Sequence, residues 1–436
     1  MKKKNFMDRM TDVVIDKLAG PMGKFASLKP MLVIKDGLVA ITPVILVGSL
    51  FLLIQLLGQP VIGGSGKPLI PALAPFAEKI GLVNSLTMGF MSFYAAIAFS
   101  VCYARVYKLD QLTMAIMGAS AFMLINIDKV SDGAIQVGNF GAAGIFAAMV
   151  TVFASGWIYR FCTRKNLVIK MPEGVPQGVG NAFTSLIPFA IVFVIAWAVR
   201  TLMGIDLSSV FTMIFSPIFK AADNIGLFTL RCFISQTFWG VGIHGDNILA
   251  PVLGPLNLLW IGENNKAAMA GVALTQLPHI WTEATERCVL FTSSEWGLLF
   301  WMYFSKKKST KAMAVACTPS AIFCIIEPLV FGLPIVMNPI LIIPWILSAT
   351  IAGFVGYGIF ALGLCNRFFV LMPWATPPPI LAFLGTGGDW RAILVVIVSF
   401  LIGVIVYYPF VKAWERQEDN EIAGAVTTEG TDTSSN

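Results

Sequence analysis

Residues 325–340 of this chain read IIEPLVFGLPIVMNPI and contain one charged side chain, Glu327. No other charge lies between Lys311 and Arg367. Placing a lone carboxylate at the centre of a bilayer costs roughly 3 kcal/mol on insertion scales. Proline removes helical hydrogen bonds, and this region holds Pro319, Pro328, Pro334, Pro339 and Pro344. The pattern predicts broken helices around one buried acid, which is typical of a polar-substrate site in a transporter. A satisfied structural Glu in a kinked helix is the alternative.

The composition predicts a membrane protein. Hydrophobic residues make up 57% of the 436 residues and charged residues only 12%, and the mean hydropathy is +0.79. A soluble protein carries about twice that share of charge. Apolar runs long enough to cross a bilayer predict helices at 31–57, 86–104, 112–127, 140–161, 182–204 and 390–411. We therefore expect an all-α polytopic membrane protein. Its net charge of +6 indicates positive cytoplasmic loops rather than a nucleic-acid partner.

The basic residues of the first half are shared unevenly between the two sides of the membrane. The side of the N-terminus carries Lys2, Lys3, Lys4, Arg9, Lys17, Lys24, Lys29, Arg105, Lys108, Arg160, Arg164, Lys165 and Lys170. The opposite side carries Lys67, Lys79 and Lys129. Since positive loops stay in the cytoplasm, we expect a cytoplasmic N-terminus, and we place the C-terminus on the same side.

The sequence offers little for metal or cofactor chemistry. The seven cysteines stand singly, without a CxxC pair, and are typical of small apolar packing residues. Two histidines are too few for most metal sites, and no Walker A motif is present. We expect no metal, no cofactor and no catalytic residue.

A glycine-rich segment surrounds the first histidine. Residues 238–255 read FWGVGIHGDNILAPVLGP and contain His244 and Trp239. Glycines let the backbone turn sharply or approach a ligand closely. The imidazole can donate and accept hydrogen bonds, which suits sugar hydroxyls, and the indole offers a flat face to a sugar ring. The alternative is an interfacial His beside a tryptophan of the membrane belt.

Two further segments interrupt the apolar runs of the second half. Residues 372–390, MPWATPPPILAFLGTGGDW, place Trp374 before three prolines and predict a re-entrant hairpin with an aromatic platform; an extracellular or interfacial loop is an equal alternative. Residues 279–287, HIWTEATER, place Glu283 and Arg287 four apart, which predicts an ion pair on a helix. A solvated or interfacial ion-pair face is the simpler interpretation of that second segment.

Three of these motifs together resemble a known family. GIHGDNILAPV, IIEPLVFGLPIVMNPI and MPW…PPP…GGDW are similar to the membrane component IIC of a bacterial phosphotransferase system, within its lactose, cellobiose and diacetylchitobiose family. The resemblance covers nearly the whole chain. It implies a permease of the bacterial cytoplasmic membrane, with about ten transmembrane helices and two re-entrant hairpins, that moves a disaccharide by an elevator-like motion. A separate component IIB, itself supplied by IIA, would phosphorylate the sugar on its 6-hydroxyl. The chain would carry no phosphorylated residue of its own.

The resemblance also implies a domain organisation and a site. The expected units are a cytoplasmic amphipathic segment (1–30), a homodimerising domain of about five helices (31–205), an amphipathic connector (206–220), a sugar-transport domain (221–414) and a disordered cytoplasmic tail (415–436). His244 and Glu327 would hydrogen-bond a cellobiose-, chitobiose- or lactose-like sugar, and Trp239 and Trp374 would line the site. The other partners are membrane lipid and a second copy of the chain.

Two departures from the family pattern concern the sugar. Members read Asn-Glu-Pro where this chain has Ile326 before Glu327, and a glycine-rich segment is replaced by Cys288–Trp296. Whether Glu327 recognises the sugar or also acts as a base stays open. Two other functions also remain: an ion-coupled secondary sugar transporter with Glu327 as proton carrier, and a membrane enzyme acting on a lipid-linked sugar.

Overall fold

The computed structural model is helical almost throughout. It describes residues 24, 27–59, 68, 70–127, 130, 131, 134–169, 171, 172, 177–333, 335 and 338–432. In these ranges two short strands, β1 (Val130–Ser131) and β2 (Ala134–Ile135), pair antiparallel. The amphipathic segment expected at 1–30 lies almost entirely outside the described residues.

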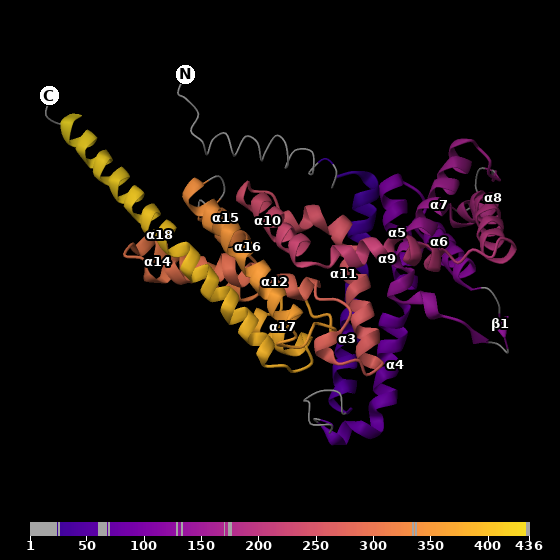
Figure 1. Cartoon of the computed structure of the whole chain (residues 1–436). Coiled ribbons are helices and arrows are strands. Elements are labelled where there is room, and N and C mark those ends of the chain that lie inside the picture. Colours follow the sequence, from indigo (N-terminus) through magenta and orange to yellow (C-terminus); the bar gives the residue numbers. More distant parts are fainter. Residues whose placement is uncertain are drawn as a thin grey trace.

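The helices of the first half pack mainly against one another. Helix α3 contacts α4 and α5, α5 contacts α6 and α7, and α6 contacts α8, so that these helices form the right-hand part of Figure 1. The bounds are α3 (Lys29–Leu57), α4 (Ala77–Thr87), α5 (Met91–Tyr107), α6 (Gln111–Asn126), α7 (Ile145–Arg164) and α8 (Gln177–Trp197), with short helical segments η2 (Pro71–Phe76), η3 (Met88–Phe90), η4 (Gly138–Phe140), η5 (Ala142–Gly144) and η6 (Ala198–Leu202).

The second half is more interrupted. Helix α16 packs between α10 and α18, and α13 also packs on α18. The bounds are α9 (Leu207–Ala222), α10 (Ile225–Gly240), α11 (Gly245–Met269), α12 (Glu283–Phe291), α13 (Gly297–Phe304), α14 (Lys308–Ile322), α15 (Glu327–Gly332), α16 (Pro339–Ala361), α17 (Pro378–Gly385) and α18 (Arg391–Asp432), with η7 (Leu274–Gln276) and the π-helical segment η8 (Thr292–Trp296).

Six helices in the described ranges are long and apolar enough to cross a membrane. Five of them match predicted spans: Lys29–Leu57, Pro71–Tyr107, Ala142–Arg164, Gly178–Leu202 and Arg391–Glu415. The sixth, Ile340–Ala361, is a span that the sequence did not predict, although the chain is broken around Glu327 as expected, since α14 ends at Ile322 and α15 is only six residues long. Pro339 is the first residue of α16, where the missing N–H is not needed, and Asn338 caps the helix by accepting from the backbone N–H of Ile340 at 3.0 Å.

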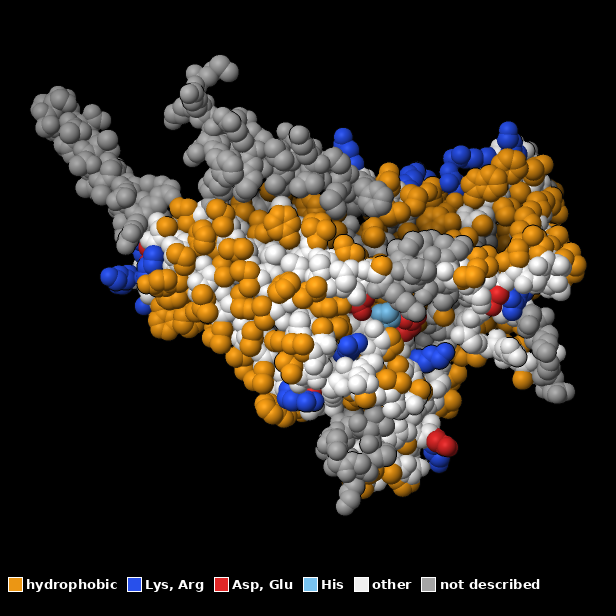
Figure 2. Space-filling model, in the orientation of Figure 1, with side chains coloured by type: hydrophobic (Ala, Val, Ile, Leu, Met, Phe, Trp, Pro, Cys, Tyr) orange, Lys and Arg blue, Asp and Glu red, His pale blue; other side chains and the backbone are white. Residues whose placement is uncertain are grey.

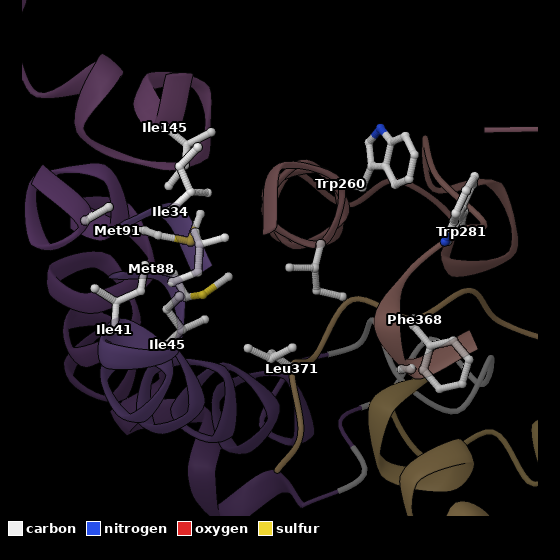
Figure 3. Close-up of a cluster of buried hydrophobic side chains, with 14 of the residues drawn as sticks. Ile34, Ile41, Ile45, Met88, Met91, Ile145, Trp260, Trp281, Phe368 and Leu371 are labelled. Carbon is white, nitrogen blue, oxygen red and sulfur yellow. The ribbon is translucent and has the colours of Figure 1, made fainter. Parts of the chain in front are cut away.

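Helix α11 joins the two halves. It contacts α3 and η5, and a Cβ added to Gly262 would overlap the side chain of Ala142. The largest buried apolar cluster continues across this junction: Figure 3 shows Ile34 and Ile45 of α3 on one side and Trp260 and Phe368 of the second half on the other. All seven cysteines are buried as free thiols. The halves therefore share a core through α11.

The last helix is longer than the sequence predicts. Helix α18 continues to Asp432, whereas composition alone predicts a disordered tail from 415; a helix that enters from a preceding span needs no new nucleation.

Figure 2 shows hydrophobic side chains spread widely over one face, with Lys and Arg gathered at the upper edge of its right-hand part. Within that half, Arg160 of α7 lies 4.0 Å and Lys29 of α3 lies 5.4 Å from the ring centroid of Tyr107.

Candidate functional site

His244 stands at the junction of α10 and α11. Helix α10 ends at Gly240, the chain turns through Gly242 with a φ of 81°, and His244 caps α11. Its Nδ1 accepts a hydrogen bond from the backbone N–H of Asn247 at 3.2 Å. Because one ring nitrogen of neutral imidazole accepts and the other donates, this cap leaves the proton on Nε2. His244 thus presents an N–H donor away from the helix.

Glu327 faces that donor from another helix. It is the first residue of α15, with Pro328 next to it. Its Oε1 lies 3.9 Å from Nε2 of His244, and the two side chains are 46% and 37% exposed. A direct hydrogen bond between nitrogen and oxygen spans about 2.7–3.2 Å, so the two groups do not bond to each other. One hydroxyl oxygen placed off the line between them can accept from the imidazole and donate to the carboxylate.

The expectation that Glu327 is buried is wrong. Protein leaves 46% of its side-chain surface uncovered. The buried carboxyl group nearby is instead Glu295, in the π-helical segment η8, whose side chain is 0% exposed. Neither of its oxygens has a hydrogen-bond partner in the described part of the chain. Proline content and charge isolation therefore located the right segment but misjudged which acid is enclosed.

The two tryptophans occupy different surroundings. Trp239 is 1% exposed, and its ring centroid lies 4.3 Å from that of His244. In this conformation it packs behind the imidazole instead of presenting a free flat face. Trp374 is 52% exposed and lies in the segment before α17. This segment adjoins the Glu327 region, since the Sγ of Cys324 lies 3.8 Å from the carbonyl oxygen of Thr376.

Helix α12 supplies ion pairs to both sides of this region. The predicted pair between Glu283 and Arg287 is confirmed, and Nη1 of Arg287 also donates to the carbonyl oxygen of Trp374 at 2.8 Å. Glu286, which precedes Arg287 in the same helix, is 6% exposed and lies 2.6 Å from Nη2 of Arg231 in α10. The same Nη2 lies 2.7 Å from Oδ1 of Asp246, two residues beyond His244. Within this segment Glu286 is therefore enclosed, while Glu283 of the predicted pair is 40% exposed.

Arg231 is the residue that the sequence analysis missed. It is the only charged residue in α10, IGLFTLRCFISQTFWG, and its side chain is 7% exposed. The criterion that singled out Glu327, an isolated charge in an apolar run, applies to Arg231 as well. A second ionic cluster lies apart from this region: Nε2 of His279 is 2.5 Å from Glu263 and its Nδ1 is 3.3 Å from Asp223.

The two departures from the family pattern both face the interior. Ile326 is 2% exposed and belongs to the apolar cluster that contains Trp239. Cys288 and Val289 are 0% exposed, and α12 and η8 pack against α16 and α18. These residues therefore change the packing behind the candidate site, not its exposed contacts.

Comparison with known proteins gives a consistent family. The model of the family "Phosphotransferase system, EIIC" matches residues 35–349. The chain is 30% identical to the PTS system cellobiose-specific EIIC component of Geobacillus stearothermophilus, over 95% of this chain and 96% of the relative. It is also 30% identical to the PTS system lactose-specific EIICB component of Staphylococcus aureus (strain COL), over 90% of this chain and 70% of the relative.

A solved structure has the same fold. The crystal structure of the transporter ChbC, the IIC component from the N,N'-diacetylchitobiose-specific phosphotransferase system, superimposes with a TM-score of 0.84. The sequences are 26% identical, and the match covers 94% of this chain and 99% of that one. The similarity therefore extends over the interrupted second half as well as the regular first half.

Proposed function

This chain belongs to the phosphotransferase system EIIC family of multi-pass proteins of the bacterial plasma membrane, and we propose that it carries a disaccharide across that membrane, coupled to the sugar's phosphorylation. The observation that carries the proposal is the 3.9 Å separation between Nε2 of His244 and Oε1 of Glu327. One atom is a donor, the other is an acceptor, and both side chains are only partly covered by protein. Such a pair suits a hydroxyl group, which both donates and accepts.

Trp374 adds an apolar surface to this pair. Its indole is half-exposed, and its backbone is tied to α12 through Arg287. Sugar rings pack their C–H faces on aromatic rings, so a second ring of a disaccharide would lie against Trp374 while the first reaches His244 and Glu327. In this arrangement Trp239 supports the imidazole and contributes to binding through His244.

The sugar that fits best is a β-linked disaccharide. The named relatives act on cellobiose, lactose and N,N'-diacetylchitobiose, which share that linkage. Ile326 and Cys288, where this chain departs from the family pattern, are buried. We therefore place the choice among these sugars in the exposed residues around Glu327 and Trp374.

The larger architecture follows the same proposal. The first five transmembrane helices (31–205) would form the interface of a homodimer, and residues 206–220 would connect them to the second domain. Residues 221–414 would move the sugar by an elevator-like motion and contain two re-entrant hairpins. The whole chain would then have about ten spans. The support is that α3–α8 pack mainly with each other, as do α10 and α12–α18, whereas α11 contacts both groups. Helix α8 exposes Phe183, Leu186 and Val194, an apolar surface for lipid or a second copy.

The phosphate donor would be component IIB, working from the cytoplasmic side. The lactose-specific relative is named as an EIICB component and is longer than this chain, which supports a IIB partner here, with IIA upstream. Both termini would lie on that side. The grouping of Lys29 and Arg160 around Tyr107 supports a basic cytoplasmic edge in the first half.

Uptake of β-linked disaccharides tests the function. Right-side-out vesicles that hold this chain and enclose its IIA and IIB, together with the proteins that pass phosphate from phosphoenolpyruvate to IIA, should accumulate a phosphorylated disaccharide when phosphoenolpyruvate is enclosed, and should not do so without it. The control is the same system with His244→Ala. Uptake of unmodified sugar driven by a proton gradient alone would instead establish an ion-coupled transporter.

A further inference from the structure

Arg231 of α10 binds two carboxylates from neighbouring helices. Its Nη2 lies 2.7 Å from Asp246 and 2.6 Å from Glu286, so one buried nitrogen joins the first turn of α11 to α12. Both carboxylates have a second donor: the hydroxyl of Ser235 donates to Oδ1 of Asp246 at 2.9 Å, and the indole N–H of Trp281 donates to Oε1 of Glu286 at 2.6 Å. Charge-assisted hydrogen bonds of this kind are the strong ones.

This network ends two residues from the imidazole. Asp246 lies in the first turn of the helix that His244 caps. The backbones also meet here, because a Cβ added to Gly245 would overlap the carbonyl group of Ser235. The start of α11 is therefore fixed on α10 from two directions. Because the cap bond from Asn247 to Nδ1 decides which nitrogen holds the proton, fixing this turn also fixes the tautomer.

We propose that Arg231 is the positioning residue of the sugar site, holding the turn at Asp246 so that His244 keeps its Nε2–H directed at Glu327. The proposal deepens the proposed function and rests on it for the identity of the ligand. Helix α12 then serves both sides of the site: Glu286 anchors Arg231, and Arg287 holds the carbonyl group of Trp374. Residues without ligand contact commonly orient those that have it, and losing them weakens binding.

The chain is well suited to a direct test, since it has only two histidines. The full-length protein is labelled with ¹⁵N-histidine alone, and the ring nitrogen shifts are recorded by solid-state NMR in lipid; His279→Gln assigns the signals. We expect the wild type to show His244 as the Nε2–H tautomer. In Arg231→Met we expect a mixture of tautomers and a loss of cellobiose affinity of about tenfold or more.

Arg231→Lys is the conservative variant. Only Nη2 of Arg231 contacts the two carboxylates, so a single ammonium group can replace it. We expect the Nε2–H tautomer and most of the affinity to return. Arg391→Met, which removes an ion pair with Asp389 outside the site, is the control and should change neither reading. Unchanged His244 signals and unchanged affinity in Arg231→Met would overturn the proposal.

Two further outcomes distinguish the role of Arg231 from a failure to fold and from a failure of the proposed function. If Arg231→Met does not fold, Asp246→Asn removes the charge that Arg231 binds in the first turn of α11; it should shift the tautomer in the same direction, and no shift would reject the proposal. If the wild type binds no disaccharide, the proposed function fails, while the tautomer still reports on Arg231. Lost affinity with an unchanged tautomer would make Arg231 merely structural.

Discussion

Nε2 of His244, at the start of α11, lies 3.9 Å from Oε1 of Glu327, at the start of α15. The imidazole accepts a hydrogen bond from the backbone N–H of Asn247 in its own helix, and the two side chains do not hydrogen-bond to each other. Two polar groups held just beyond hydrogen-bonding distance of each other can both bond to one hydroxyl group of a ligand. Binding then requires little rearrangement of the protein.

Glu327→Gln should largely abolish sugar binding and uptake. The substitution keeps the shape but replaces charge-assisted hydrogen bonds with neutral ones, a loss of about 1.5–3 kcal/mol, or roughly ten- to hundredfold in Kd. The measurement is calorimetric titration with cellobiose in detergent. Glu78→Gln, an exposed acid on α4, is the control. Near-normal binding by Glu327→Gln would make the carboxylate structural.

His244→Ala and Glu327→Gln should not be additive. If one hydroxyl bridges the two side chains, either substitution removes most of that bridge, and the double variant loses less binding energy than the sum of the single losses. The measurement is the dissociation constant of the wild type, both single variants and the double variant. Strict additivity of large losses would place the two residues against different parts of the sugar.

The two tryptophans should separate binding from stability. Trp374→Ala removes a half-exposed ring and should weaken binding by about 1–3 kcal/mol, with little change in thermal stability. Trp239→Ala removes a buried ring and should destabilise the protein by about 3–5 kcal/mol. Thermal unfolding and sugar titration are both measured. Trp390→Ala, which is 64% exposed, is the control; equal behaviour of all three variants would refute the assignment.

Gly403→Ala should destabilise the second half. A Cβ added to Gly403 would overlap the carbonyl group of Ser293 in η8. A Cβ added to Gly297 would lie 2.7 Å from Cα of Gly403. Overpacking of this kind costs about 1–3 kcal/mol. Gly358→Ala in α16, where no atom lies within 4 Å, is the matched control and should be neutral or stabilising. Equal melting temperatures of the two variants would contradict the close packing of η8 on α18.

The sequence predicted the spans better than the burial. Helices such as α3 and α7 follow from long apolar runs, and the pairing of Glu283 with Arg287 follows from helical spacing. The opposition of His244 and Glu327 required a family resemblance, since no local rule joins residues so far apart in the chain. Burial was the weak point, because hydropathy does not say which side chains a tertiary contact encloses: Glu327 is half-exposed and Glu295 is enclosed.

The interior position of every native thiol has a practical side. All seven cysteines are buried, so a maleimide reagent reaches an added surface cysteine first. Leu112 of the first half and Leu362 of the second are 70% and 76% exposed, and each accepts a label without disturbing a core. A spin-labelled pair at these positions would report any change in the distance between the two halves. The native cysteines should therefore take up little label, and distances between two added labels can be measured without first replacing them.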